Sequence, residues 1–281
     1  MLSGNRKLTI TQRLVLGGIL VLLVLVATFP FYWILLTSLK SGRAVYDTSQ
    51  VLLAQGLTLT NYQLLFKETE ILHWIWFTSL VATVATVISL IIGVLAAYSV
   101  TNFRYRGQKA VTFAVFLSYV IPQSILFIPL YFILNQMRLV NQFPGLVFAY
   151  LTFCVPFCTW LLMSYFRTIP VELGEAALID GCSPLGVLWR IILPLTGPGV
   201  VTAAIFSFTN CWNEFLYAAT LAQTNDMRTM SLGLAGFLTS DVFIWGQMMA
   251  AAIVSTIPML IIFILLQRYV VQGLTLGGVK G

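Results

Sequence analysis

The chain has 281 residues, of which 59% are hydrophobic and only 9% are charged. A water-soluble surface normally needs about 25% charged residues, so this composition excludes a soluble globular protein and places the chain in a bilayer. The formal net charge of +6 does not indicate nucleic-acid binding, because the basic residues lie singly or in pairs at the edges of apolar stretches. Six helical spans of about 20 residues, with their loops, would use the whole length and leave no room for a soluble catalytic domain.

Apolar stretches with few charges mark the expected membrane spans. In chain order they cover about 14–39, 74–100, 110–134, 145–166, 197–221 and 247–266. Each is long enough to cross the hydrocarbon core as a helix, so we expect an all-α integral membrane protein with six transmembrane helices. The first stretch is interpreted as an uncleaved anchor, since its apolar run continues without a small-residue cleavage site.

The distribution of Lys and Arg predicts the orientation of these spans. Positive residues are retained in the cytoplasm, and most of them fall on the side that carries both chain ends. We therefore expect cytoplasmic termini and cytoplasmic loops at about 101–109 and 167–196. The extracytoplasmic loops should then lie at about 40–73, 135–144 and 222–246.

The loop between the fourth and fifth spans contains the signals of a short helix. Pro170 suits the first turn of a helix, and Glu172 and Glu175 lie where the helix dipole favours negative charge. Gly181 can adopt the left-handed conformation that ends a helix. The sequence therefore predicts a helix of about three turns from Pro170 to Asp180.

This helix is too short to be stable alone in water and needs a surface to pack on. Its apolar and small positions offer a narrow face for the groove of a partner protein. These positions are Leu173, Ala176, Ala177 and Ile179. A second short helix should follow and end at Pro194. An ordinary amphipathic linker between two spans is the alternative interpretation of the loop.

The same loop resembles the cytoplasmic EAA loop of ABC-importer permeases. The resemblance rests on Glu175-Ala176-Ala177, on Gly181 six residues after the glutamate, and on the Ile-Leu-Pro segment at 192–194. It combines residue types, their spacing and a position before the penultimate span, which an ordinary linker would not need. In that family the short helix seats in a cleft of the ATPase. The residues that the resemblance assigns to this coupling loop are Glu172, Glu175, Ala176, Ala177, Asp180, Gly181 and Pro194.

Two further segments resemble the smaller permease of maltose-type sugar importers. Residues 210–215, which read Asn-Cys-Trp-Asn-Glu-Phe, are similar to its Trp-Asn-Glu/Asp-Phe segment, and 273–281 are similar to its C-terminal tail. In that permease the tail inserts between two ATPase subunits. The resemblance implies the same contact for Gly277, Gly278, Lys280 and Gly281. A disordered chain end is the alternative, because the glycines make ordering costly and no apolar face offsets that cost.

With the six spans, the resemblance covers essentially the whole chain and implies the type I ABC importer permease fold. It implies an N-terminal tail, first span and loop over 1–69, a transmembrane core over 70–268 with the EAA loop at about 168–194, and a cytoplasmic tail over 269–281. It also implies a second homologous permease, two ABC ATPases that bind ATP and Mg, and an extracytoplasmic sugar-binding protein. The chain itself would hold no cofactor. It would lie in the cytoplasmic membrane of a bacterium or archaeon.

The fifth span contains polar residues that suggest a translocation path. Glu214 is the only acidic residue within a predicted span, where a carboxylate is costly unless it meets water, a partner or another polar group. Asn210 and Asn213 are spaced to share one helical face with it, and Tyr217 continues that face. Such a face can line a cavity for a hydroxyl-rich solute, with Trp212 or Tyr217 as a ring for sugar stacking. A buried hydrogen-bond network against another helix is the alternative.

Tyr119 and Gln123 are weaker candidates for the same path. Both lie near Pro122, so packing at a proline kink would explain them as well. The candidate residues for the path are therefore Asn210, Trp212, Asn213, Glu214, Tyr217, Tyr119 and Gln123.

The chain lacks the motifs of an enzyme. It contains no Gly-x-x-x-x-Gly-Lys-[Ser/Thr] segment, so ATP hydrolysis must come from another subunit. The single histidine, His73, makes a catalytic triad improbable and gives a metal site almost no ligands. We therefore expect a transport subunit without catalysis or a bound metal. Two alternatives stay open: an ABC permease for a solute other than a sugar, and a secondary transporter with Glu214 at its ion site.

Overall fold

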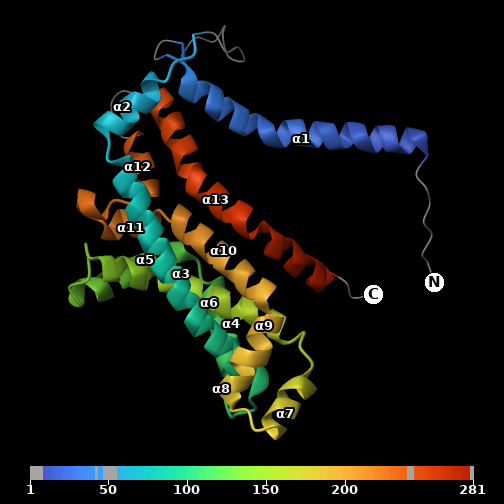
Figure 1. The fold of residues 1–281 in the computed structure, drawn as a ribbon. Coiled ribbons are helices and arrows are strands. Elements are labelled where there is room, and N and C mark those ends of the chain that lie inside the picture. The colour runs from blue at the N-terminus through green and yellow to red at the C-terminus, as the bar shows by residue number, and fades with distance from the viewer. Residues whose placement is uncertain (1–8, 42–43, 47–55, 239–243, 279–281) are drawn as a thin grey trace. The chain divides into compact units, whose positions relative to one another are not determined.

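The computed structural model describes residues 9–41, 44–46, 56–238 and 244–278, and only the backbone of 269–278. Every regular element among these residues is a helix, which confirms the all-α expectation (Figure 1). The elements are α1 (Ile10–Leu39), α2 (Thr60–Glu68), α3 (Ile71–Asn102), α4 (Gln108–Val120), α5 (Gln123–Gln136), α6 (Phe143–Phe166), α7 (Val171–Ile179), α8 (Pro184–Val187), η2 (Leu188–Ile192), α9 (Leu193–Leu195), α10 (Gly197–Asn213), α11 (Leu216–Leu221), η3 (Asn225–Met227), α12 (Met230–Gly236) and α13 (Trp245–Gly278).

Four helices in the described part of the chain are long and apolar enough to cross a membrane alone. They are α1, α3, α6 and the Trp245–Arg268 part of α13. Two bent pairs raise the number to six if each pair counts as one span. The helices α4 and α5 meet at 100°, and Pro184–Leu195 meets α10 at 80°. The third apolar stretch, expected as one span, is therefore two helices at nearly a right angle.

The bend between α4 and α5 follows from Pro122. A proline disfavours the helical conformation of the residue before it, and Ile121 accordingly has an extended ψ of 124°. Pro122 itself precedes α5, with ψ of 133°. Tyr119 and Gln123 thus lie on two different helices on either side of the bend.

The described residues divide into two compact units. The first contains the residues up to 69 together with 237–254. In this unit the Asn61 side-chain amide donates to the carbonyl of Ser38 at 2.8 Å and to that of Lys40 at 2.7 Å. These bonds hold α2 against the end of α1. The apolar window of α1 contains no residue buried within this chain, so its surface is available to lipid or to another membrane chain.

The second unit contains 70–236 and the residues from 255 onward, and it is built on α3, α6 and α10, which pack together (Figure 1). Small residues allow membrane helices to approach closely, and α3 carries a buried series of them. The series is Ala82, Ala85, Ser89, Gly93 and Ala97. At Gly93 the approach is so close that a Cβ would lie 2.7 Å from the Cβ of Cys158 on α6. The α3–α6 contact is therefore specified by residue size.

Candidate functional site

The loop after α6 forms the helix that the sequence predicts. α7 runs from Val171 to Ile179, and its capping residues are Pro170 and Asp180, the two expected ends. Glu172 lies in the first turn, where the helix dipole favours its charge. In Figure 1, α7 and α8 lie together at one end of the α3–α6–α10 bundle. Local sequence signals therefore define this helix, although its short length makes it depend on that bundle.

Gly181 closes the end of α7, with φ of +86°. The amide of Cys182 donates to the carbonyl of Ala177 at 2.9 Å, and the amide of Gly181 donates to the carbonyl of Leu178 at 3.1 Å. This pair of bonds is a Schellman motif, which places a left-handed residue where Gly181 stands. Among the residues that the structure describes, and apart from the two chain neighbours of Gly181, no heavy atom lies within 4 Å of the position that a Cβ would occupy. A substitution at Gly181 would therefore be strained by its backbone conformation and not by a clash.

α7 has an inner and an outer side. Leu173, Ala176 and Ile179 are exposed, and Ile179 is exposed to 86%. Ala177 is buried in a hydrophobic cluster of this chain. The expectation that Ala177 faces a partner together with the other three is therefore wrong. Ala177 follows Ala176 by one residue, which corresponds to a rotation of about 100° around the helix axis. This rotation is enough to place Ala177 on the inner side.

The cluster around Ala177 joins the loop to the membrane helices. It unites Tyr98 of α3, Met163 and Phe166 of α6, Val187 of α8, Leu188 and Ile192 of η2, and Ala203 of α10. The Tyr98 hydroxyl also donates to the carbonyl of Pro184 at 2.8 Å, which ties the start of α8 to α3. The cluster therefore packs α7, α8 and η2 directly against α3, α6 and α10.

The second half of the loop is a run of short helices. Ser183 caps α8 by accepting a bond from the amide of Gly186 at 3.1 Å, and Pro184 occupies the first helical position. η2 is a π-helix, and α9 follows it without a break. The last helix of this run, α9, ends at Leu195, one residue after the expected end at Pro194.

The fifth apolar stretch is not one helix. α10 ends at Asn213, and Glu214 takes an extended conformation with ψ of 126°. α11 begins only at Leu216. The single helical face expected for Asn210, Asn213 and Glu214 therefore does not exist, because the helical period stops before Glu214. Tyr217 belongs to the next helix for the same reason.

Glu214 holds this break together from inside the protein, with 7% of its surface exposed. Its carboxyl oxygens accept bonds from the amides of Tyr217 at 2.8 Å and Ala218 at 3.1 Å, in the first turn of α11. Its carbonyl accepts a 2.5 Å bond from the hydroxyl of Ser231, and Tyr150 lies beside its carboxyl group. Backbone donors of this kind make a buried acid tolerable within a membrane protein. The position of Glu214 therefore agrees with its alternative interpretation, which was a buried hydrogen-bond network.

The two rings expected to stack on a sugar are buried as well. Trp212 is 4% exposed and stacks on Phe208, with ring centroids 5.9 Å apart. Tyr217 is 1% exposed and stacks on Phe153 at 6.1 Å. Neither ring offers a free face in this structure, which corrects the expectation for both.

The buried side of α10 meets α6 through small polar groups. The Sγ atoms of Cys154 and Cys211 lie 3.3 Å apart, and the Sγ of Cys158 lies 3.0 Å from the Oγ of Ser207. All three cysteines are free and buried. They act here as small residues that let the two helices pack closely.

The other side of α10 is exposed and carries a different pattern. Phe206, Asn210 and Asn213 follow one another at i, i+4 and i+7, and all three are exposed. Two of the polar residues expected in the path thus lie on a surface that this chain leaves uncovered. Glu214, the third of these residues, is buried.

Aromatic rings extend this surface from α10 onto α6 and α4. Phe206 lies 6.2 Å from Phe157, and Phe157 lies 6.0 Å from Tyr119 between ring centroids. Tyr119 stacks on Trp160 at 5.5 Å with an angle of 7° between the rings. We call the surface formed by Phe206, Asn210, Asn213, Phe157, Tyr119 and Trp160 the aromatic–amide surface. The sequence does not identify three of these residues, because only the packing of three helices unites them. They are Phe157, Trp160 and Phe206. The one available signal in the sequence was the i, i+4 spacing of Phe206 and Asn210.

The remaining predicted residues lie at the edges of the described structure. Gln123 is exposed at the first position of α5, beyond the bend from Tyr119. α13 continues to Gly278, so Gly277 and Gly278 end a helix, and the expected tail boundary at residue 269 lies within it. Lys280 and Gly281 lie outside the described residues.

A family model described as binding-protein-dependent transport system inner membrane component matches residues 89–276, which include α7 and the aromatic–amide surface. The trehalose transport system permease protein SugB of Mycobacterium tuberculosis is 35% identical over 257 residues, 91% of this chain and 93% of that protein. The trehalose/maltose transport system permease protein MalG of Thermococcus litoralis is 33% identical over 272 residues, 95% of this chain and 96% of that protein.

A third relative is the sulfoquinovosyl glycerol transport system permease protein SmoH of Agrobacterium fabrum. It is 35% identical over 254 residues, 90% of this chain and 89% of its own length. Among solved structures, a chain of a bacterial ABC transporter involved in the import of the acidic polysaccharide alginate aligns with a TM-score of 0.72 at 20% identity. The alignment covers 94% of this chain and 99% of that chain, so the two share a fold.

Proposed function

This chain belongs to the family of binding-protein-dependent transport system inner membrane components, and we propose that it is a permease subunit of an ATP-driven sugar importer. The family is one of membrane permeases, so the chain is a multi-pass membrane protein of an ABC transporter. The proposal adds the substrate class, the coupling route and the partners. The observation that carries it is the combination, in one unit, of an exposed aromatic–amide surface and a loop helix packed onto the same three membrane helices.

The aromatic–amide surface supports a sugar as the substrate. A carbohydrate presents C–H faces that pack on rings and hydroxyls that pair with amides. Tyr119 and Trp160 are 44% and 41% exposed, and Asn210 and Asn213 lie on the exposed side of α10. The three relatives described above are named for the transport of trehalose, maltose or sulfoquinovosyl glycerol. We infer that this surface forms one wall of the translocation path and that a second permease forms the other.

α7 provides the coupling to an ATPase. Its outer side combines the apolar side chains of Leu173 and Ile179 with the exposed acids Glu172, Glu175 and Asp180. An amphipathic helix of this kind fits a hydrophobic groove with a basic rim. Because its inner residue Ala177 is packed in the cluster with α3, α6 and α10, ATPase closure would move α7 and those helices as one body.

The importer would contain further subunits. The long apolar surface of α1 and the aromatic–amide surface are both uncovered in this chain, and a second permease would cover at least the latter. Two ATPases would bind ATP and Mg and occupy the α7 side, and an extracytoplasmic binding protein would deliver the sugar. A related alginate transporter has a structure in complex with a periplasmic protein bound to an alginate pentasaccharide. The membrane would be the cytoplasmic membrane of a bacterium or archaeon, with both chain ends in the cytoplasm.

The C-terminal residues would contact the ATPases as well. Gly277 and Gly278 end α13 and permit close approach of another backbone. Deleting 274–281 should leave the complex assembled but lower sugar-stimulated ATP hydrolysis beyond any loss in expression. Unchanged stimulation in the truncated complex would show that the tail is dispensable.

Reconstitution tests the proposed function. The complex that co-purifies with this chain would be placed in proteoliposomes with ATP inside and with labelled mono-, di- and oligosaccharides outside together with the binding protein. The account predicts ATP-dependent uptake of one sugar class that survives an uncoupler. Uptake that stops with the uncoupler while ATP persists would instead identify a secondary transporter, and uptake of a non-sugar solute alone would disprove the substrate class.

A further inference from the structure

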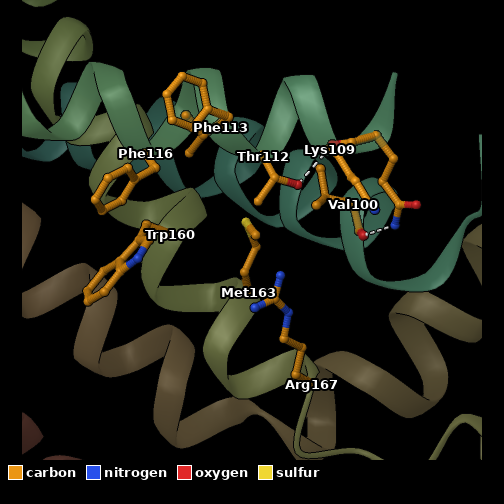
Figure 2. A pocket seen from close by; sticks show the side chains of 10 residues that line it. Val100, Lys109, Thr112, Phe113, Phe116, Trp160, Met163 and Arg167 are labelled. Atoms are coloured by element: carbon orange, nitrogen blue, oxygen red, sulfur yellow. Dashed lines mark hydrogen bonds between the residues drawn. The ribbon is translucent and has the colours of Figure 1, made fainter. Parts of the chain in front are cut away.

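A cavity of about 520 Å³ lies between α4 and α6, next to the end of α3 (Figure 2). Its volume is within the range of about 300–1,000 Å³ that is typical of ligand pockets. The lining changes in character along its length. Lys109 and Arg167 lie at one end, and Phe116 and Trp160 lie together at the other (Figure 2). The cavity is therefore amphipathic.

At the polar end of the cavity, the donors that remain for a ligand are those of the two cations, Lys109 and Arg167. The Gln108 side chain donates to the carbonyl of Val100 at 2.6 Å, and the Thr112 hydroxyl donates to the carbonyl of Gln108 at 2.9 Å. Neither Lys109 nor Arg167 forms an ion pair with any acidic side chain in the part of the chain that the structure describes. Two unneutralised cations beside one cavity favour an anionic group between them.

The two cations also lie at helix ends, where the membrane–water interface is expected. Arg167 follows directly after Phe166, the last residue of the apolar span α6, and Lys109 is the second residue of α4. Basic side chains at the ends of spanning helices reach the membrane–water interface. From there the aromatic end of the cavity extends along α4 and α6 into the apolar part of both helices.

We propose that this cavity binds an anionic phospholipid of the surrounding leaflet, with its phosphodiester at the end lined by Lys109 and Arg167 and an acyl chain against Phe113 and Phe116. A soluble phosphate would use only the cationic end and leave the aromatic end unoccupied. A zwitterionic lipid carries a positive group of its own, which would be repelled by the two cations of the site, Lys109 and Arg167. Basic pockets between membrane helices are known to hold acidic headgroups, which fits both ends of this cavity.

Lipid retention by the assembled importer tests the proposal. The complex is embedded in nanodiscs that contain equal amounts of phosphatidylcholine and phosphatidylglycerol, released into mild detergent, and weighed by native mass spectrometry. The wild-type complex should retain phosphatidylglycerol in preference to phosphatidylcholine. The Lys109→Gln/Arg167→Gln double variant should lower that preference about tenfold, whereas Lys109→Arg/Arg167→Lys should retain it.

A matched control separates the cavity from the general charge of this side. Arg104 and Arg106 lie in the adjacent α3–α4 loop, are exposed, and do not line the cavity. The Arg104→Gln/Arg106→Gln double variant removes the same charge and should retain the lipid as wild type does. Size-exclusion chromatography confirms that each variant assembles before its lipids are weighed.

Three results would overturn the proposal. The first is equal retention of the two lipids by the wild type, and the second is equal loss of phosphatidylglycerol in the cavity and control variants. The third concerns other occupants. Displacement of the lipid by glycerol 3-phosphate at millimolar concentration would identify a soluble phosphate site, and cross-linking of a cysteine at Phe113 to the second permease, without bound lipid, would identify a subunit interface.

Discussion

The loop helix α7 lies between two spans and the break between α10 and α11 lies within one apolar stretch, and the two are stabilised in different ways. α7 is held by apolar packing of its inner residue, Ala177, and by the backbone bonds that Gly181 permits. The break is held by one buried side chain, Glu214, which supplies acceptors to two amides of α11. Packing can transmit motion of a rigid piece, whereas a single polar group fixes one conformation of a joint. Under the proposed coupling, we therefore expect α7 to move with the bundle while the α10–α11 joint keeps its shape.

The largest effect should come from removing the acid at the joint. In Glu214→Ala, two amides of α11 lose their acceptor in a buried site, which should destabilise the chain by about 2–4 kcal/mol. Glu214→Gln keeps one acceptor and should fall between this variant and the wild type. Asn213→Ala, one residue away and exposed, is the control and should be neutral. Denaturant titration of the purified complex measures this, and a wild-type midpoint in Glu214→Ala would show that the acid does not hold the joint.

A second pair of variants separates the two sides of α7. Ala177→Trp overfills a buried site and should cost about 1–3 kcal/mol, with the loop released to proteolysis. Ala176→Trp changes the exposed neighbour, so it should leave the loop protected and yet weaken ATPase binding. Limited proteolysis and co-purification of the ATPase distinguish them. If the two variants gave the same proteolysis and the same ATPase binding, the assignment of Ala177 to the inner side and of Ala176 to the outer side would be wrong.

The conformation of Gly181 gives a smaller, local effect. Gly181→Val at φ of +86° should be strained by about 1–2 kcal/mol. Since nothing lies near its Cβ position, the strain should misdirect the chain after α7 and lower coupled ATP hydrolysis without affecting membrane insertion. Gly181→Asn, which tolerates the left-handed region, should restore most of the activity. Wild-type coupling in Gly181→Val would mean that the Schellman motif is dispensable.

The smallest change in stability is expected on the aromatic–amide surface. In a cysteine-free background, single cysteines at Asn210 and Asn213 should react with a water-soluble maleimide, at rates that change when ATP binds. A cysteine at Trp212, which is buried on the other side of α10, should stay unreactive in every state. Inertness at both Asn positions throughout the cycle would remove them from the translocation path.

The sequence predicts those features that depend on neighbouring residues in the chain. The ends of α7 follow from Pro170 and Gly181, and the helical spans follow from apolar runs between charges. The sequence placed Ala177 on the partner-facing side, which is wrong, and it left Glu214 open between the translocation path and a buried network. Helical periodicity says which residues share a face, but only tertiary packing says which face is buried. The carboxyl group of Glu214 caps the start of α11 after a break that no proline or glycine marks in the sequence.

The aromatic–amide surface was outside the reach of the sequence for a related reason. Its rings come from α4, α6 and α10, and the stacking of Tyr119 on Trp160 joins residues that are far apart in the chain. Trp212 and Tyr217 look equally suitable in the sequence, yet both are consumed by core packing. Residue type alone therefore does not separate a binding ring from a packing ring in a helical membrane protein.

The central claim, that the outer side of α7 seats on an ATPase, can be measured directly by site-specific photo-cross-linking. A photoreactive amino acid at Ile179, which is 86% exposed, should cross-link to the ATPase in a transport-competent complex. The same group at Tyr105, 39% exposed in the α3–α4 loop, is the control and should not cross-link to it. Absence of an ATPase adduct from Ile179 in an active complex, or equal adducts from both positions, would contradict the account.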